Sequence, residues 1–489
     1  MRFLLDTNIV IPAEPTRPTD VEAGTQAVAA LLKVLSKGEH TSLVHPASVK
    51  ELQGDRDPQR AATRVVLLGK YPGLERPPSM SRRLVAVLGT PTPTSHTEVD
   101  MLLLSALYAD AVDYLVTEDD GIHRRAKRVG LAERVLTVAD AVATVHALFP
   151  TVPETPPFVT SKLAYELDQT DPIFSSFRSD YVGFDDWLAK CKREHRQCWV
   201  IQAGRTYGGI CIVNDESPRE YGISGKILKV CSFKIADEHR GHRYGELMLK
   251  ALFGYLVENR YDGVFVEVFS KHQQLVTLLS DFGFEDIGES SKAERVLLKW
   301  QRPPDHRTAQ PGPLEYNVRY GPYAVSLAGA RVFVVPIRPQ YHSLLFPELD
   351  QQMVLATESH PFGNSIRKAY LCHSKIRKIA VGDLILFYRS ERDQAVTAVG
   401  VVEDTHVSSE AVQIARFVGE RTVYAYSEIE KMSVKPVLAV LFRLARTLKN
   451  PWDVDLLRRS GILRKAPQSF MEIHGRAVDW IATQLDAPH

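Results

Sequence analysis

Two proline-rich stretches divide the chain of 489 residues. Residues 149–158 (FPTVPETPPF) contain four prolines, and residues 301–316 (QRPPDHRTAQPGPLEY) contain four more. Because proline lacks the backbone N–H that helices and central strands require, neither stretch can continue a regular element. A chain of this length also exceeds what one ordinary hydrophobic core holds. We therefore predict three domains, at residues 1–150, 151–310 and 311–489.

The composition is that of an ordinary soluble protein. The net charge is +1 and charged residues make up 24% of the chain, so any polyanion site must be local. The five cysteines are odd in number and form no C-x-x-C pair, which favours reduced thiols over disulfides or structural zinc. No apolar run approaches the length of a membrane span. We expect a cytoplasmic protein without a membrane partner.

The three predicted domains differ in the rhythm of their apolar residues. Residues 1–148 alternate short apolar strands with helical patterns, which predicts βαβ units around a parallel sheet. Residues 158–303 combine helices with longer strands, which predicts an α+β fold. Residues 312–489 show strands around a few helices, which predicts a small β-barrel or curled sheet. The predicted fold class is therefore multidomain α/β.

Four acidic residues of the first domain stand at positions where parallel sheets collect functional groups. Asp6 and Asp119 each follow a short apolar strand, and the carboxyl ends of such strands meet at one edge. Glu51 and Asp100 lie near predicted helix starts. If the four converge, their repulsion calls for a cation, and oxygen ligands suit Mg²⁺ or Mn²⁺. The alternative is that these acids form turns, cap helices or solvate a loop.

This arrangement resembles the PIN domain, a family of metal-dependent ribonucleases. The resemblance rests on LLDTN, HPASVKEL, EVDMLLLSAL and LVTED, and it spans residues 1 to about 148. It implies that Asp6, Glu51, Asp100 and Asp119 are both catalytic residues and metal ligands, with Thr7 and Asn8 as their supports. The basic run after Asp119 could hold RNA phosphates or form a solvated helix face. Its members are Arg124, Arg125, Lys127 and Arg128.

The middle domain contains a glycine-bearing turn between a strand and a helix, in KILKVCSFKIADEHRGHRYGELMLK. Such a turn offers backbone N–H groups to a pyrophosphate. The stretch resembles the GNAT acetyltransferases, whose pattern Q/R-x-x-G-x-G/A is matched by Arg240 and Gly245, while Arg243 replaces the middle glycine. Arg243 could crowd the ligand or add a charge to its phosphates. The resemblance implies acetyl-CoA as cofactor, bound by Ile235, Arg240, Gly241, Arg243, Tyr244 and Gly245.

Catalytic residues of the middle domain are harder to assign. The family's tyrosine that often protonates the leaving thiolate stands four residues before a Gly-Phe pair, here Gly283 and Phe284, and that position holds Leu279. A leucine cannot act as a general acid. Glu267 is the best candidate base, with Cys231 and Ser232 on another strand. The alternative for Glu267 is an ordinary outward-facing carboxylate.

The last domain places basic residues before a strand-Gly-Asp-strand unit, in IRKAYLCHSKIRKIAVGDLILFYRS. This pattern resembles PUA-like folds of the ASCH and EVE type, which are associated with RNA or modified bases. The resemblance implies phosphate contacts from a basic cluster made of Arg367, Lys368, Lys375, Arg377 and Lys378. Tyr370, Phe387 or Tyr388 could then stack on bases, or they could belong to the core.

Three functional hypotheses follow. The first is a divalent-metal-dependent endoribonuclease, toxin-like or RNA-processing, that carries an acetyl-CoA-binding domain and an RNA-reading domain. The second is an N-acetyltransferase acting on a tRNA-borne or protein amine, with the PIN-like domain as a binding module. The third is a non-enzymatic RNA-binding scaffold. The resemblances imply RNA, with tRNA as one candidate, as a partner, and also an antitoxin protein and a second copy of the chain.

Overall fold

The structure is a computed structural model that describes residues 1–13, 24–54, 57–150, 157–216, 221–304, 311–349, 363–391 and 394–486. It divides into two compact units. The N-terminal unit comprises Met1–Thr151 and Ser408–Lys435, and the second unit comprises Val152–Val407 and Pro436–His489. Residues 151–156 and 305–310 of the two proline-rich stretches lie outside the described residues. The second stretch ends in the first turn of α13 (Pro313–Tyr320), where proline is tolerated, so the prediction that it contains no regular element is wrong there. The division into three domains stays a prediction, but residues 408–435 pack in a different unit from the domain to which we assigned them.

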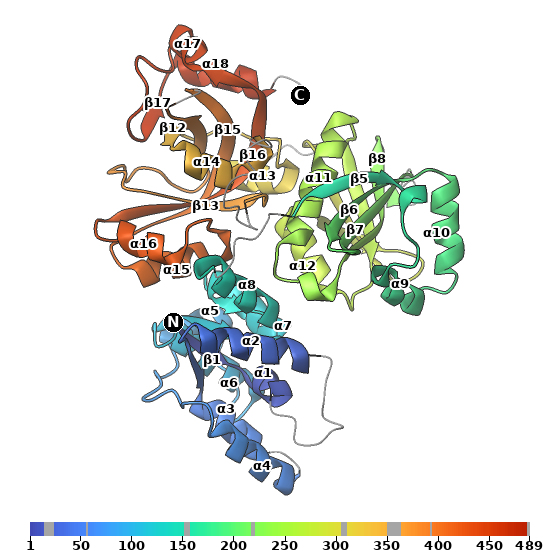
Figure 1. The fold of residues 1–489 in the computed structure, drawn as a ribbon, viewed down its shortest axis with the longest axis vertical. Helices are drawn as coiled ribbons and strands as arrows, with labels where there is room; N and C mark the ends of the chain where they lie inside the picture. The colour runs from blue at the N-terminus through green and yellow to red at the C-terminus, as the bar shows by residue number, and fades with distance from the viewer. Residues whose placement is uncertain are drawn as a thin grey trace. The chain divides into compact units, whose positions relative to one another are not determined.

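The sheet of the N-terminal unit is parallel throughout, as predicted, with strand order β2-β1-β3-β4. Figure 1 labels β1 of this sheet among its helices. Its strands are β1 (Arg2–Leu5), β2 (Thr41–Val44), β3 (Tyr114–Val116) and β4 (Val135–Leu136). Leu5 pairs with Val44 on one side and Val116 on the other. The residues that follow these strands are therefore neighbours at the carboxyl edge of the sheet.

Helices cover both faces of this sheet because successive side chains of β1 point to opposite sides. Phe3 and Leu5 pack in one apolar cluster with residues of α2 and α8, and Leu4 packs in another with residues of α6 and α7. The side chain of Ser95 accepts a hydrogen bond from the backbone N–H of Glu98 and so begins α6. The helices are α1 (Thr7–Ala13), α2 (Thr25–Lys37), α3 (Pro46–Gln53), α4 (Pro58–Leu68), α5 (Arg82–Leu88), α6 (His96–Tyr108), α7 (Asp120–Arg128) and α8 (Val138–Leu148).

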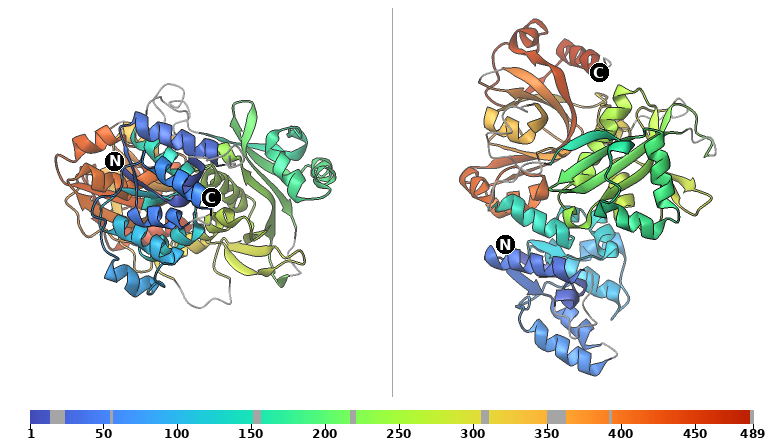
Figure 2. Two further views of the ribbon diagram at one scale, coloured as in Figure 1. Left: turned by 90° about the horizontal axis from the view of Figure 1, so that it is seen from below. Right: turned by 45° about the vertical axis from the view of Figure 1, so that its right-hand side comes forward.

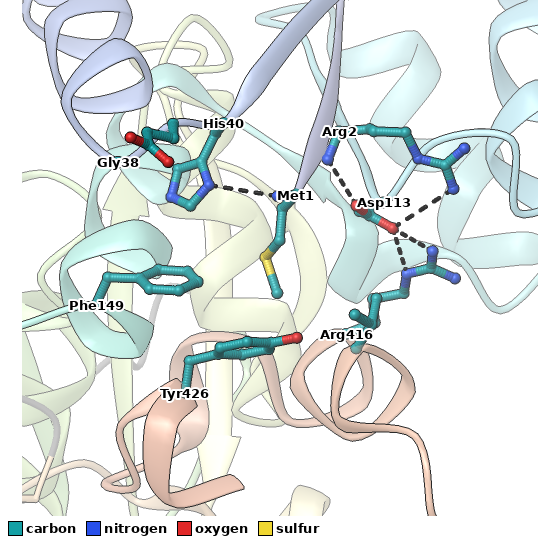
Figure 3. Close-up of a pocket in the computed structure, with 10 residues that line it drawn as sticks. Met1, Arg2, Gly38, His40, Asp113, Phe149, Arg416 and Tyr426 are labelled. Atoms are coloured by element: carbon teal, nitrogen blue, oxygen red, sulfur yellow. Dashed lines mark hydrogen bonds and ion pairs between the residues drawn. The ribbon is translucent and has the colours of Figure 1, made fainter. Parts of the chain in front are cut away.

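Two short helices from far along the sequence complete the N-terminal unit, namely α15 (Ala411–Val418) and α16 (Tyr426–Met432). Arg416 of α15 forms an ion pair with the buried carboxylate of Asp113. The ring of Tyr426 lies 5.1 Å from that of Phe149. These side chains surround a cavity of about 480 Å³ that His40 and Met1 also line (Figure 3).

The middle part of the second unit (residues 157–304) is built on a seven-stranded sheet of order β10-β11-β9-β8-β7-β6-β5. Only β8 and β9 pair in parallel among the strands described here, and their pairing runs from Ile227 to Val230 of β8. Beyond Val230 the two strands separate. The strands are β5 (Val159–Leu163), β6 (Gln197–Ala203), β7 (Thr206–Asp215), β8 (Ile227–Ile235), β9 (Gly263–Val268), β10 (Glu285–Glu289) and β11 (Arg295–Trp300).

The helices of the middle part lie on both faces of its sheet (Figures 1 and 2). Trp199 and Ile201 of β6 pack with residues of α11 and α12, and the alternate residues Cys198 and Val200 pack with residues of α10. The helices are α9 (Ser175–Asp180), α10 (Phe184–Arg193), α11 (Tyr244–Glu258) and α12 (Gln273–Asp281).

The C-terminal part of the second unit (residues 311–407 and 436–486 as described) holds a six-stranded sheet of order β13-β16-β15-β14-β12-β17. β12 and β14 are parallel, whereas β13 and β16 are antiparallel, so the sheet is mixed. The strands are β12 (Val332–Ile337), β13 (Arg367–Cys372), β14 (Leu384–Arg389), β15 (Ala395–Ser408), β16 (Val437–Asp453) and β17 (Met471–Ile473). The helices are α13 (Pro313–Tyr320), α14 (Pro339–Leu345), α17 (Val454–Arg459) and α18 (Arg476–Asp486).

The α-helices that the structure describes include none that is both long and apolar enough to cross a membrane.

Candidate functional site

The four predicted acids come from four different elements of the N-terminal unit. Asp6 follows β1, Glu51 lies in α3, Asp100 lies in α6, and Asp119 caps α7 by accepting a hydrogen bond from the N–H of Ile122. Burial is the main reason that the pKa of Asp100 is raised to about 6. The charges of the other three carboxylates add to this rise. The fold thus gathers the four acids into one electrostatic cluster.

Asp6 is held by hydroxyl and backbone donors at the sheet edge. Its side chain accepts hydrogen bonds from the N–H of Thr7 at 2.7 Å and from the hydroxyl of Thr117 at 2.7 Å. Asn8 in turn donates its Nδ2 to Thr117 at 3.0 Å. Burial raises the pKa of the Asp6 carboxyl, these hydrogen bonds oppose the rise, and neighbouring carboxylates add to it. Thr7 and Asn8 therefore lie where the resemblance places supporting residues.

Sequence reasoning did not identify two other residues at this edge. Thr117 and His45 directly follow β3 and β2, just as Asp6 follows β1, and that shared position was the available signal. The Nδ1 atom of His45 accepts a hydrogen bond from the N–H of Ala47, and burial lowers the pKa of His45 to about 4. His45 is therefore a neutral, buried group at the carboxyl end of β2.

Glu51 contacts the ring of an exposed histidine that the sequence did not mark. The carboxylate of Glu51 lies against Nδ1 of His96, the first residue of α6, and this hydrogen bond raises the pKa of His96. The hydroxyl of Thr7 lies 3.5 Å from Glu51 and also contacts Asp6, so it links the two acids.

Part of the predicted basic run faces the protein rather than solvent. Arg125 Nη1 lies 2.9 Å from an oxygen of Asp100, and Arg128 donates Nη2 to the carbonyl of Val87 at 2.7 Å. A fully solvated helix face is therefore wrong for Arg125, whereas Arg128 is exposed. Arg125 instead brings a positive charge into the acid cluster.

The acid cluster supplies suitable donors for a hard divalent ion but does not form a closed metal site. Within the described ranges, no group of three or more His, Cys, Asp or Glu side chains is arranged to hold a metal ion. The oxygen chemistry of the four acids and the raised pKa of Asp100 fit Mg²⁺ or Mn²⁺. In this structure, however, Arg125 forms an ion pair with Asp100, and the ring of His96 contacts the carboxylate of Glu51.

The turn before α11 shows a different role for Arg243 from the two that we considered. Arg243 adopts the left-handed conformation (φ 57°), which explains why glycine suits this position. Its side chain is 6% exposed and turns inward, with Nε 3.5 Å from Glu246. Nη1 donates to the carbonyl of Arg367 on β13 at 3.1 Å. Arg243 therefore joins the middle and C-terminal parts and faces away from the outer side of the turn.

The other residues of the predicted acetyl-CoA site lie at the end of β8, in the turn that follows it and at the start of α11. Ile235 ends β8 and pairs with Gly209. A Cβ atom on Gly245 would lie 2.7 Å from Cδ2 of Leu278, so α11 packs closely against α12 at this glycine. The ring of Tyr244 stacks on that of His239 at 5.0 Å.

Arg240 and Gly241 shape the outer side of the same turn. Arg240 forms an exposed ion pair with Asp237 at 2.5 Å. Gly241 has a positive φ of 78°, so the turn has two left-handed residues, at positions 241 and 243.

Glu267 is held by two donors. One carboxylate oxygen accepts a hydrogen bond from the Tyr221 hydroxyl at 2.5 Å, and the other lies 3.0 Å from Lys229 Nζ. These contacts compete with a role as general base. Burial raises the pKa of the Cys231 thiol to about 12, so this thiol is not an activated nucleophile. Ser232 is 6% exposed, and its hydroxyl has no hydrogen-bond partner among the described residues.

The aromatic residues predicted to stack on bases belong to the core of the C-terminal part. Tyr370, Phe387 and Tyr388 are 7%, 0% and 0% exposed, because both faces of their sheet are covered. The stacking hypothesis is therefore wrong for these three residues.

The predicted basic cluster is divided by the fold. Arg367 neighbours the buried Glu246, and Lys368 is 1% exposed and donates Nζ to the carbonyl of Leu345 at 2.6 Å. Burial lowers the pKa of Lys368 to about 7. The remaining members, Lys375, Arg377 and Lys378, are exposed on the loop between β13 and β14. Of the five predicted members, these three are exposed, and Lys378 among them lies 3.7 Å from the carboxylate of Glu472.

Comparison with known proteins identifies one family. Residues 366–484 match the family described as EVE domain, which confirms the PUA-like prediction for this region. The matched region includes α15 and α16 of the N-terminal unit. A search of curated proteins finds no match. The PIN-like assignment of residues 1–150 stays a prediction.

Solved structures match parts of the chain. ASCH from Zymomonas mobilis is 13% identical, with a TM-score of 0.24, and the match covers 31% of this chain and 94% of that one. The Campylobacter jejuni N-acetyltransferase PseH is 14% identical, with a TM-score of 0.23, over 30% of this chain and 99% of that one. An IAA acetyltransferase from Bacillus cereus is 10% identical, with a TM-score of 0.24, over 29% and 96% of the two chains.

Proposed function

We propose that the protein is a divalent-metal-dependent endoribonuclease whose C-terminal part reads RNA. The observation that carries this proposal is the convergence of four carboxylates at the carboxyl edge of a parallel sheet. Each comes from a different element; burial, with a smaller contribution from neighbouring carboxylates, raises the pKa values of Asp6 and Asp100. Repulsion among the carboxylates lowers the stability of the fold unless a bound cation or substrate offsets it.

Asp6, Glu51, Asp100 and Asp119 would hold the ion. When bound, a divalent cation supplies an activated water and charge stabilisation for in-line attack on a phosphodiester. Thr117 and the N–H of Thr7 fix both oxygens of Asp6, so this carboxylate is already oriented. The hydroxyl of Thr7 lies 3.5 Å from the carboxylate of Glu51.

The RNA-reading role rests on the EVE domain match and on the exposed loop between β13 and β14. Lys375, Arg377 and Lys378 lie on this loop. Arg377 donates Nη1 to the carbonyls of Ser374 and Ile376, which holds its charge in a fixed place on the loop. A fixed cation on an ordered loop suits contacts with phosphate groups.

The test is RNA cleavage with added Mn²⁺ or with EDTA, using one structured and one unstructured RNA. Cleavage should require the metal and should be lost in Asp6→Asn and Asp100→Asn. Asp119→Asn should lose cleavage, whereas Asp120→Asn, its exposed neighbour on α7, should retain it. Cleavage that survives in EDTA or in Asp6→Asn would exclude this function.

A second candidate function is acyl transfer by the middle part to a tRNA-borne or protein amine. The specific observation is the separation of β8 and β9 beyond Val230, beside the turn that precedes α11. Ser232 places a buried hydroxyl without a partner on the separated segment of β8. Calorimetry with acetyl-CoA tests this candidate: heat of binding supports it, and no heat at high micromolar concentration removes it.

A further inference from the structure

Two segments of the N-terminal unit carry basic residues but no acidic ones. Residues 76–97 contain three arginines and no aspartate or glutamate. Residues 121–132 contain three arginines and one lysine, again without an acid. α5 lies in the first segment and α7 in the second. The exposed cations of the two helices are Arg82, Arg83, Arg124, Lys127 and Arg128.

α5 and α7 form one surface because they share a core. Leu84 of α5 packs in the same apolar cluster as Ile122 and Ala126 of α7. Arg128 also donates Nη2 to the carbonyl of Val87 at 2.7 Å, which joins the ends of the two helices. Since the apolar sides of both helices point into this cluster, their exposed cations share one side of the unit. We call these five cations the α5–α7 surface.

Helix stability explains only part of the α5–α7 surface. Lys127 and Arg128 lie in the last turn of α7, where the helix dipole favours cations. Arg82 and Arg83 begin α5, where the same dipole disfavours them. Among the described residues, neither of these two arginines nor Arg124 has an ion-pair partner. Their placement does not stabilise the fold, so it calls for an anion from outside the chain.

The chemistry of the α5–α7 surface fits a phosphate backbone. A guanidinium group binds phosphate oxygens through paired N–H donors, and four of the five cations are arginines. A protein partner instead buries an apolar centre with few charges. Val87 is the one exposed large apolar residue of the two segments. RNA is also the polyanion that the EVE domain match supports.

The α5–α7 surface borders the acid cluster. The N–H of Ser81, the residue before α5, donates to Oγ of Ser105 on α6 at 3.1 Å. Asp100 lies five residues earlier on α6, which is about 7.5 Å along the helix axis. An RNA strand on the α5–α7 surface would therefore pass close to the four acids.

We propose that the α5–α7 surface binds the sugar-phosphate backbone of RNA. This contact is additional to the one proposed for the loop between β13 and β14, and it reads no sequence because it is made to phosphates. It needs no metal ion. The N-terminal unit therefore holds an RNA strand whether or not it cleaves that strand.

The test is the salt dependence of RNA binding in EDTA, measured by fluorescence anisotropy with a labelled single-stranded RNA. A surface variant combines Arg82→Ser, Arg83→Ser and Arg124→Ser. A charge-matched control variant removes three exposed cations from other helices of the same unit, by Lys33→Ser, Lys37→Ser and Lys431→Ser. A lysine variant keeps the charge of the surface, by Arg82→Lys, Arg83→Lys and Arg124→Lys.

The surface variant should bind the RNA about tenfold more weakly than the control variant at low salt. Its slope of log affinity against log salt should be smaller by about 2, since each phosphate contact on a single strand contributes about 0.7. The lysine variant should keep most of the slope. Equal slopes in the surface and control variants would overturn the inference. Loss of metal-dependent cleavage with these slopes as expected would overturn the proposed nuclease alone.

A labelled poly-L-glutamate tests the other occupant, an acidic protein. It should bind the wild-type chain far more weakly than the RNA does. Binding as tight as that of RNA, and lost in the surface variant, would assign the α5–α7 surface to an acidic protein and overturn the inference. Circular dichroism confirms that each variant is folded.

Discussion

The guanidinium of Arg416 binds the carboxylate of Asp113, a residue 303 positions earlier in the chain. Arg416 Nε donates to Asp113 Oδ1 at 2.8 Å, and Nη1 donates to Asp110 at 2.8 Å. The other oxygen of Asp113 accepts the backbone N–H of Arg2 at 2.6 Å. This buried pair anchors residues 408–435 in the N-terminal unit.

Arg416→Met should destabilise the N-terminal unit, because it leaves the buried charge of Asp113 without its main partner. We expect a loss of about 3 kcal/mol in the free energy of unfolding, measured with urea. Arg124→Met, at an exposed position, should change it by less than about 0.5 kcal/mol. The double variant Asp113→Asn with Arg416→Met should lose less than the sum of the two single variants. Additive losses would show that the pair does not act as a unit.

Asp100→Asn should stabilise the metal-free protein more at neutral than at acidic pH. The folded-state pKa of Asp100 is raised from 3.8 to about 6. The stability that its protonated form contributes is therefore fully present below 3.8 and is lost as the pH rises through about 6. The variant does not undergo this loss, so its stability relative to wild type should increase by about 3 kcal/mol between acidic and neutral pH.

The measurement for Asp100→Asn is urea unfolding in EDTA across that pH range. Asp120→Asn serves as the control and should show a constant difference from wild type. A difference for Asp100→Asn that does not vary with pH would contradict the electrostatic coupling of the four acids.

Arg243→Gly should lower stability even though it restores the family's glycine. Relief of the left-handed conformation is worth about 1 kcal/mol, whereas removing a charged partner from buried Glu246 costs about 3 kcal/mol. Unfolding measurements should therefore show a net loss. If the middle part binds acetyl-CoA, calorimetry should show little change in affinity, since the Arg243 side chain faces inward. A gain in stability would mean that backbone strain outweighs the ion pair.

Gly283→Ala should severely destabilise the second unit. Gly283 has a φ of 83°, and a Cβ atom there would lie 2.0 Å from the carbonyl oxygen of Val318, a backbone atom that cannot move cheaply. We expect a loss of about 3 kcal/mol or more in thermal unfolding. Gly204→Ala is the matched control, because Gly204 also has a positive φ but nothing lies within 4 Å of its Cβ position. The control should lose only about 1 kcal/mol.

The sequence was informative where a property depends on neighbours along the chain. The apolar run before Asp6 predicted a buried strand, and strand-to-helix alternation predicted the parallel sheet. The contacts of Asp100 with Arg125 and of Asp6 with Thr117 join positions 25 and 111 residues apart, so no local pattern marks them. Their detection requires the packed fold.

Two properties that the sequence leaves open share a physical cause. Alternating aromatic and apolar residues around Tyr370 and Phe387 do not reveal that both faces of the sheet are covered. Likewise, a positive charge in the sequence does not reveal that Arg243 and Lys368 turn inward to carbonyl oxygens and a buried carboxylate. Burial is a property of what packs against a residue, and neighbours in sequence do not report it.

The position of α15 and α16 has a consequence for synthesis of the protein. The N-terminal unit includes residues 408–435, so it remains incomplete while the intervening part of the chain is translated. At roughly 5–20 residues per second, that interval lasts tens of seconds. During this interval, Asp113 lacks its partner Arg416 from α15, and Phe149 lacks its partner Tyr426 from α16. The N-terminal unit can therefore be completed only after most of the C-terminal region has emerged from the ribosome.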